Sequence, residues 1–305
     1  MQVARLQYVA LQLSAIWLPA ISTFPLQAAE VIVQASADTS FHQNVPDFNM
    51  GGNEFVAAGA NGSLSPARAL FKFSLDEVIP SGSMITSVSL QLSVIGVPNL
   101  LAADSTFELR RLNQNWNEGF GLGPLGSPAG AGETTWNARF YPDVLWSVPG
   151  GASPHDFAGA VSSTSPVSGI SNYIFSSTPT MVADVQGWVD SPESNYGWIL
   201  ISQSEDVSRT ARRFGSRTSA SPPQLTIEFQ ARPAFDSVVL SDQSIQLEFT
   251  AEASHAYSVE FKDSLETLNW STLINYPVQS VDGTLIATDS ITSSPQRFYR
   301  LARTQ

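Results

Sequence analysis

The sequence predicts an all-β protein of two sandwich domains. Three features indicate this class: short runs in which apolar and polar residues alternate, turn-forming Gly, Pro and Ser between the runs, and a single short segment with helical periodicity. The run 88–94 (VSLQLSV) alternates strictly, which places its apolar side chains on one face of a strand. Many short strands separated by turns are typical of a sandwich or a jelly roll.

Further strands are expected along the chain. Residues 71–75, 107–110 and 225–229 show the same period of two, so each is expected to bury one face. Residues 198–201 (WILI) are apolar throughout, which is typical of a central strand. Residues 183–189 carry the helical pattern, with Asp184 placed to cap the first turn of a short helix.

A domain boundary is expected near Ala231-Arg-Pro233, just after the strand that ends at Phe229. The tail beyond it alternates again, and its size suits a small immunoglobulin-like or fibronectin-like sandwich. The predicted organisation is a leader over residues 1–29, a first domain over residues 30–230 and a second domain over residues 231–305.

The leader has the pattern of a secretory signal peptide. Arg5 precedes the mostly apolar stretch 6–21, and small residues close the segment at Ala28-Ala29. Polar residues and a proline interrupt the stretch, so it falls short of the ~20 apolar residues that a membrane span needs. We expect a secreted, extracellular protein with no membrane span after signal cleavage.

The amino-acid composition excludes several classes of function and of site. The chain has 305 residues and a net charge of −12, and only 14% of its residues are charged. Such a surface repels the phosphates of nucleic acid, so nucleic acid is not an expected partner. There is no cysteine, which excludes disulfides, thiolate catalysis and zinc–sulfur sites.

Several short motifs, each weak alone, follow one another in order along the first domain. They are residues 37–41 (ADTSF), 69–75 (ALFKFSL), 85–90 (ITSVSL), 111–112 (RL), 116–119 (WNEG), 135–137 (TWN), Trp146 with 149–151 (PGG), 185–188 (VQGW), 195–198 (NYGW) and 213–217 (RFGSR). In this order the segment from about Ala35 to Gln230 resembles the DNRLRE-type domain. That domain is a bacterial extracellular jelly-roll module related to a family of carbohydrate-binding modules that includes alginate binders.

The resemblance implies a jelly-roll β-sandwich for the first domain. The tail is similar to small sandwiches at the end of secreted bacterial proteins, a resemblance that implies no chemistry. The expected fold is therefore all-β, with a jelly-roll β-sandwich followed by a smaller immunoglobulin-like or fibronectin-like β-sandwich.

No catalytic set stands out. Gly121-Leu-Gly-Pro-Leu-Gly126 fits the dinucleotide-binding string, but it contains Pro124 and no helix follows, so we interpret it as a loop. The sequence has no nucleophile elbow and no histidine spacing for zinc. His155-Asp156 is interpreted as a loop pair with an exposed imidazole.

Two acidic residues, Glu118 and Glu133, lie in an aromatic loop region and could act as the paired carboxylates of a glycosidase. The alternative is that they are surface or turn acids that pair with Arg110, Arg111 or Arg139. We expect no enzymatic activity.

No cofactor is expected, apart from a structural calcium ion. Calcium needs only oxygen ligands, and Asp38, Asp47, Asp184 and Asp190 are candidates, of which Asp38 and Asp184 are retained. Helix capping is the favoured role for Asp184.

Residues 113–171 are rich in Gly, Pro and Ser yet carry many aromatic residues. Sugars pack their C–H faces on flat rings, so we expect a polysaccharide or another cell-envelope component to bind through aromatic side chains here. The predicted binding residues are Trp116, Trp136, Arg139, Tyr141 and Trp146. The alternative is that these rings cover the sandwich as core residues, and the protein is a structural or adhesive surface protein without a glycan ligand.

Overall fold

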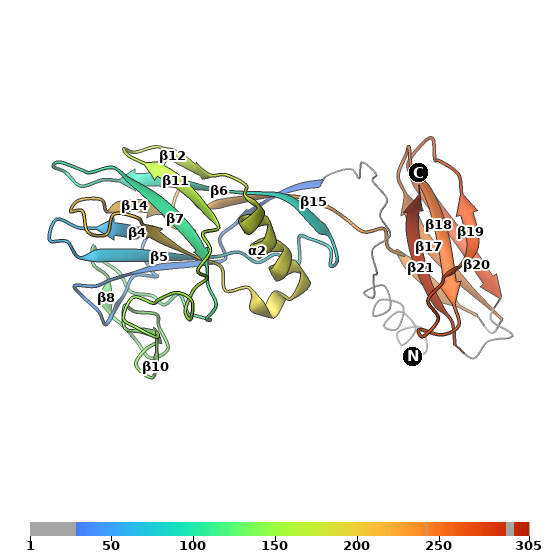
Figure 1. Ribbon diagram of the computed structural model, residues 1–305, viewed down its shortest axis with the longest axis horizontal. Helices are drawn as coiled ribbons and strands as arrows, with labels where there is room; N and C mark the ends of the chain where they lie inside the picture. The colour runs from blue at the N-terminus through green and yellow to red at the C-terminus, as the bar shows by residue number, and fades with distance from the viewer. Residues whose placement is uncertain (1–28, 242, 291–295, 305) are drawn as a thin grey trace. The chain divides into compact units, whose positions relative to one another are not determined.

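The computed structural model describes residues 29–241, 243–290 and 296–304 (Figure 1). Two compact units follow one another, the first ending at Ala231 and the second beginning at Arg232. Strands dominate both units, and the described residues include one α-helix and one short 3-10 helix. The prediction of an all-β sandwich protein is confirmed. The predicted leader lies outside the described residues, except for Ala29.

The first unit is built on an antiparallel sheet of eleven strands. Their order is β1-β15-β6-β14-β4-β5-β13-β7-β11, with β12 paired to β6 and β2 paired to β5. The elements of this unit are β1 (Ala29–Gln34), β2 (Ala37–His42), β3 (Phe48–Asn49), β4 (Phe55–Ala60), β5 (Pro66–Lys72), β6 (Met84–Gly96), β7 (Ser105–Arg111), β8 (Ser127–Pro128), β9 (Ala138–Phe140), β10 (Val144–Leu145), β11 (Ser163–Val167), β12 (Asn172–Phe175), α2 (Pro179–Asp190), the 3-10 helix (Pro192–Ser194), β13 (Trp198–Ser202), β14 (Arg212–Gly215) and β15 (Gln224–Gln230).

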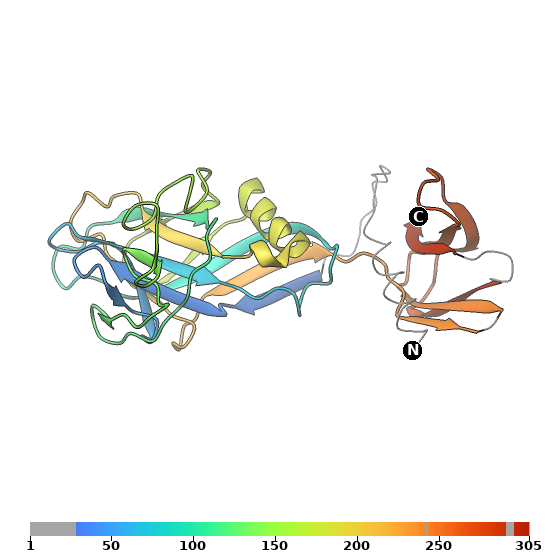
Figure 2. The same cartoon turned by 90° about the horizontal axis from the view of Figure 1, so that it is seen from below.

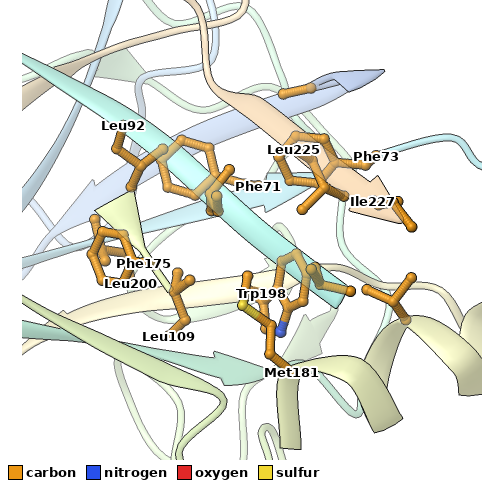
Figure 3. Close-up of a cluster of buried hydrophobic side chains, with 14 of the residues drawn as sticks. Phe71, Phe73, Leu92, Leu109, Phe175, Met181, Trp198, Leu200, Leu225 and Ile227 are labelled. Atoms are coloured by element: carbon orange, nitrogen blue, oxygen red, sulfur yellow. The ribbon is translucent and has the colours of Figure 1, made fainter. Parts of the chain in front are cut away.

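The main core of this unit lies within the sheet, where side chains of strands that are not paired, such as Phe107 on β7 and Phe214 on β14, pack together. The helix α2 packs against β6 and contributes further core residues (Figures 2 and 3). Alternate residues of β6 from Val88 to Val94 are buried in this core, as the period of two predicts. Trp198 of β13 is central to it, with its ring centroid 4.5 Å from that of Trp188 on α2 and 6.2 Å from that of Phe73. The core therefore joins the helix to β6 and to β13.

The helix α2 begins at Pro179, before the predicted start at residue 183. The Thr178 hydroxyl caps it by accepting a backbone hydrogen bond at 3.0 Å. The prediction that Asp184 caps the first turn is therefore wrong. Asp184 lies inside the helix, is buried, and accepts a hydrogen bond from the Trp198 indole. No helix in the described part of the chain is long and apolar enough to cross a membrane.

The second unit has two three-stranded antiparallel sheets, ordered β16-β17-β20 and β19-β18-β21. The strands are β16 (Ser237–Leu240), β17 (Ser244–Ala251), β18 (Ala256–Lys262), β19 (Ser271–Tyr276), β20 (Gly283–Ser290) and β21 (Phe298–Thr304). Leu247, Phe249 and Val259 belong to the core that both sheets share. The buried Asp289 on β20 accepts a hydrogen bond from the Tyr299 hydroxyl on β21 at 2.8 Å, so a polar contact also joins the two sheets.

Candidate functional site

Residues 113–161, between β7 and β11, form a long loop region that we call the loop platform. Its strand pairings are short: β8 pairs with β3, β9 pairs with β10, and Phe157 forms an isolated bridge with Leu112. Beneath it lies a second apolar cluster to which β2, β5 and β13 contribute Phe41, Leu70, Ile199 and Ile201. On β5 and β13 these residues alternate with those that face the main core, so the loop platform covers the opposite face of these two strands.

Three tryptophans that the sequence predicted to bind a glycan lie inside this second cluster. Trp116, Trp136 and Trp146 are 6%, 5% and 4% exposed. The Phe41 ring packs against two of them, with centroids 5.8 and 6.0 Å away. The indole N–H groups of Trp116 and Trp146 donate to backbone carbonyls at 2.8 and 3.0 Å. The strand β13 is apolar on both faces. These rings shield from water the face that points away from the main core. The structure thus places them as core residues, the alternative raised by the sequence.

The other two predicted residues, Arg139 and Tyr141, are half-buried residues of the loop platform. The Arg139 guanidinium lies 5.6 Å from the centroid of the Phe140 ring, which is also half-buried. Phe120, which the sequence did not single out for binding, is 83% exposed. The amides of Phe120 and Tyr141 donate to the side chain and the carbonyl of Glu133, both at 2.9 Å. We call Phe120, Arg139, Phe140 and Tyr141 the rim residues.

A buried asparagine, Asn49, holds the loop platform to the sandwich. Its Nδ2 donates to the carbonyls of Glu118 and Thr134 at 2.8 and 2.9 Å. Its Oδ1 accepts from the amides of Gly51 and Gly121 at 2.9 and 3.0 Å. Three of these four hydrogen bonds fix the loop platform, at Glu118, Gly121 and Thr134, and the bonds to Glu118 and Gly121 lie on either side of Phe120.

The glycine-rich string 121–126 serves this close packing. A Cβ atom on Gly121 would lie 1.9 Å from the Asn49 carbonyl oxygen, and one on Gly126 would lie 2.1 Å from it. Gly126 also has a φ of +80°, which favours glycine. The two-residue strand β8, not a helix, follows the string, so the geometry needed for a dinucleotide is not present there.

Asp38, Glu118 and Arg217 form a charged cluster at the base of the loop platform. Arg217 binds the Glu118 carboxylate through two guanidinium nitrogens, with Nη2 to Oε2 at 2.8 Å. The Asp38 amide donates to Glu118 Oε1 at 2.9 Å, and the Arg217 amide donates to the Asp38 carboxylate. Burial raises the pKa of Asp38 to about 7, against the hydrogen bond from Arg217.

The two acids considered for glycoside hydrolysis both have structural partners. Glu118 pairs with Arg217 and not with Arg110, Arg111 or Arg139. Glu133 accepts hydrogen bonds from the amides of Phe120 and Gly130, each at 2.9 Å. Each carboxylate therefore fixes the loop platform.

His155-Asp156 has the wrong order for a catalytic triad. Asp156 accepts hydrogen bonds directly from the Ser147 hydroxyl and amide and from the Ala152 amide, at 2.7 Å for Ala152. The His155 ring is 68% exposed and contacts the same carboxylate at 3.3 Å. A triad requires the histidine between serine and carboxylate, whereas here the carboxylate lies between them. Burial raises the pKa of Asp156, but these hydrogen bonds outweigh it and hold the pKa below its ordinary value.

The two calcium candidates are likewise engaged by protein donors. Asp184 accepts hydrogen bonds from Ser162 and Trp198 and lies 3.3 Å from Arg111, and burial raises its pKa. Asp38 belongs to the charged cluster described above. Within the described residues, no group of three or more His, Cys, Asp or Glu side chains could hold a metal ion.

Comparison of the chain with protein-family models and with curated proteins finds no match. Three features of the loop platform bear on function. They are the backbone held by Asn49 and Glu133, the three buried tryptophans, and the exposed ring of Phe120 among the rim residues.

Proposed function

We propose that the first unit is a non-catalytic carbohydrate-binding domain of a secreted protein, and that the rim residues of the loop platform contact the polysaccharide. The observation that carries the proposal is Phe120, an aromatic ring 83% exposed on a backbone held by Asn49 and Glu133. The ring stays accessible to a ligand on a backbone that is already ordered, which supports a contact role for Phe120.

The chemistry of the rim suits a sugar. Flat rings pack against the C–H faces of a pyranose, and the Tyr141 and Arg139 side chains supply hydrogen-bond donors on the same loop platform. Because the backbone is already ordered, little further conformational entropy is lost when a ligand binds. A single exposed ring supplies about 1 kcal/mol, so affinity is expected to be micromolar or weaker. The ordered resemblance to the DNRLRE-type domain and the signal-like leader support the same proposal.

The test is a glycan array and a polysaccharide co-sedimentation assay with the secreted chain. Phe120→Ser should weaken binding about fivefold, the equivalent of about 1 kcal/mol, without lowering the melting temperature. Leu100→Ser is the matched control, because Leu100 is an apolar side chain 70% exposed on another loop of the same unit. Its binding should equal that of the wild type. Absence of any retained glycan, or equal losses in both variants, would overturn the proposal.

A second candidate function is that of a structural or adhesive surface protein without a glycan ligand. The burial of Trp116, Trp136 and Trp146 favours it, because packing alone then accounts for those rings. Periodate oxidation of the target surface separates the two functions, since it destroys the vicinal diols of sugars. Adhesion that survives periodate supports the structural function, whereas loss of adhesion supports carbohydrate recognition.

A further inference from the structure

The segment 119–126 of the loop platform (GFGLGPLG) mixes glycines with apolar residues. Three of the glycines lie on its inner side, against Asn49. A Cβ atom on Gly119 would lie 2.4 Å from the Asn49 side-chain oxygen, and Cβ atoms on Gly121 and Gly126 would collide with the Asn49 carbonyl oxygen. The inner side of the segment therefore has room for glycine only.

The apolar residues of the segment are exposed to water. Phe120 is 83% exposed, Leu122 is 62% exposed and Leu125 is 41% exposed, and Pro124 is exposed as well. We call these four residues the apolar ridge. The segment cannot turn over to bury them, because side chains on its inner side would clash with Asn49. The exposure of the apolar ridge therefore follows from the way the segment is attached.

The backbone of the segment is already supplied with hydrogen bonds. Five amides donate within the protein, namely those of Phe120 to Glu133, Gly121 to Asn49, Leu122 to Ser127, Gly123 to Asn53 and Gly126 to Gly123. Pro124 has no amide proton. A paired amide keeps its hydrogen bond when water leaves, so an apolar medium can cover these groups at little cost. The same pairing leaves few backbone donors for a hydroxyl-rich ligand.

The segment also lies within an uncharged stretch. No charged residue occurs between Glu118 and Glu133. Glu118 is paired with Arg217, and Glu133 accepts two backbone hydrogen bonds. The exposed residues in this stretch are apolar or glycine: Phe120, Leu122, Pro124, Leu125, Pro128, Gly130 and Ala131. Covering the stretch therefore requires no charge to leave water.

These properties match the interface of a lipid bilayer. Apolar side chains there enter the boundary between headgroups and acyl chains, and paired backbone groups can follow them without loss of hydrogen bonds. The fluid lipid fits around projecting side chains such as Leu122 without a preformed groove. The chain has a net charge of −12 and no basic residue in the stretch 119–132, so anionic headgroups would repel it. The lipid that fits best has a neutral headgroup.

We propose that the apolar ridge docks the protein on a lipid surface with neutral headgroups, by insertion of Phe120, Leu122 and Leu125 into the interface. This goes beyond the proposed binding of a polysaccharide. Phe120 is also a rim residue, whereas Leu122 and Leu125 are not. Variants of the two leucines therefore test the lipid surface and leave the rim residues intact.

The test is co-sedimentation of the secreted chain with phosphatidylcholine vesicles. The wild type is expected to bind at millimolar lipid, and about 30% phosphatidylglycerol in the vesicles should weaken binding by charge repulsion. Leu122→Ser should lower the partition coefficient about fivefold, and Leu122→Ser combined with Leu125→Ser about twentyfold. The melting temperature should not fall, because both side chains are exposed.

Leu100→Ser, the matched control on another loop of the first unit, should bind vesicles as the wild type does. Absence of wild-type binding at about 5 mM lipid, or equal losses in Leu100→Ser and Leu122→Ser, would overturn the proposal. Stronger binding to the anionic vesicles would contradict a neutral lipid surface. Polysaccharide co-sedimentation of Leu122→Ser should equal that of the wild type, so failure of either proposal is seen apart from the other.

A second measurement reports insertion itself. The chain has no cysteine, so Leu122→Cys provides a single site for an environment-sensitive fluorophore. Its emission should shift to shorter wavelength when the labelled protein binds vesicles, whereas the same label on Leu100→Cys should keep its emission. Vesicle-bound protein whose label at position 122 shows no shift would contradict insertion of the apolar ridge.

Discussion

Two buried titratable groups on β2, Asp38 and His42, should make the stability of the first unit depend on pH in opposite directions. Their side chains lie on the same face of the strand, because an even number of residues separates them. Burial raises the pKa of Asp38 from 3.8 to about 7 and lowers the pKa of His42 from 6.5 to about 4. Glu118 and Arg217 face Asp38, and the positive charge of Arg213 adds to the effect of burial on His42.

The sign of each effect follows from which state binds more protons. For Asp38 the folded protein binds more protons between pH 3.8 and about 7, so its contribution to the free energy of unfolding is lost as the pH rises through this range. For His42 the unfolded chain binds more protons between about pH 4 and 6.5, so its contribution grows with pH. One pKa unit corresponds to about 1.4 kcal/mol, which gives on the order of 4 kcal/mol for Asp38 and 3 kcal/mol for His42.

The two contributions oppose each other in the wild type, and single substitutions should separate them. Relative to wild type, Asp38→Asn should gain on the order of 4 kcal/mol of unfolding free energy between pH 4 and 7. His42→Leu should lose on the order of 3 kcal/mol between pH 4 and 6.5, again relative to wild type. Urea unfolding followed by tryptophan fluorescence measures both, because the first unit holds five buried tryptophans. Parallel pH curves for wild type and both variants would refute the reasoning.

The packing of the loop platform yields two further predictions. Trp136→Ala should cost about 3–5 kcal/mol of unfolding free energy, since this buried ring packs on Phe41, and a cost below about 1 kcal/mol in urea unfolding would show that the ring is not a core residue. Gly121→Ala should lower the melting temperature, because its Cβ would clash with the Asn49 carbonyl. The control Gly169→Ala, which meets no atom within 4 Å, should change stability by no more than about 0.5 kcal/mol. Equal effects of the two alanine substitutions in calorimetry would contradict the clash.

Local sequence patterns predicted the strands well and the helix boundary less well. The alternation at 88–94 falls within β6, and the continuous apolar run at 198–201 falls within β13, whose residues are all buried. The helix start was missed although the signal is present in the sequence. Thr178-Pro179 combines a capping hydroxyl with a proline in the first turn, which is a stronger start signal than Asp184.

The candidate site was harder to predict, because its determinants are not local. A Gly- and Pro-rich loop with tryptophans has the same composition whether the rings face a ligand or the second face of β13. The apolar character of β13 on both faces was the one signal that a cover is needed. Asn49 shows the same difficulty, since its partners at Glu118, Gly121 and Thr134 lie 69, 72 and 85 residues away.

Contacts between residues far apart in the sequence determine how the loop platform can open. The chain has no cysteine, so the platform is held to the strands by non-covalent contacts such as those of Asn49, the Glu118–Arg217 pair and the Trp116 indole on the Tyr196 carbonyl. Each contact joins segments 69 to 99 residues apart, so opening the platform requires the sandwich to lose packing as well. Its amide protons should therefore exchange with the sandwich strands as one cooperative unit. We therefore expect that a ligand bound to the rim residues, as proposed, would leave the arrangement of the loop platform unchanged.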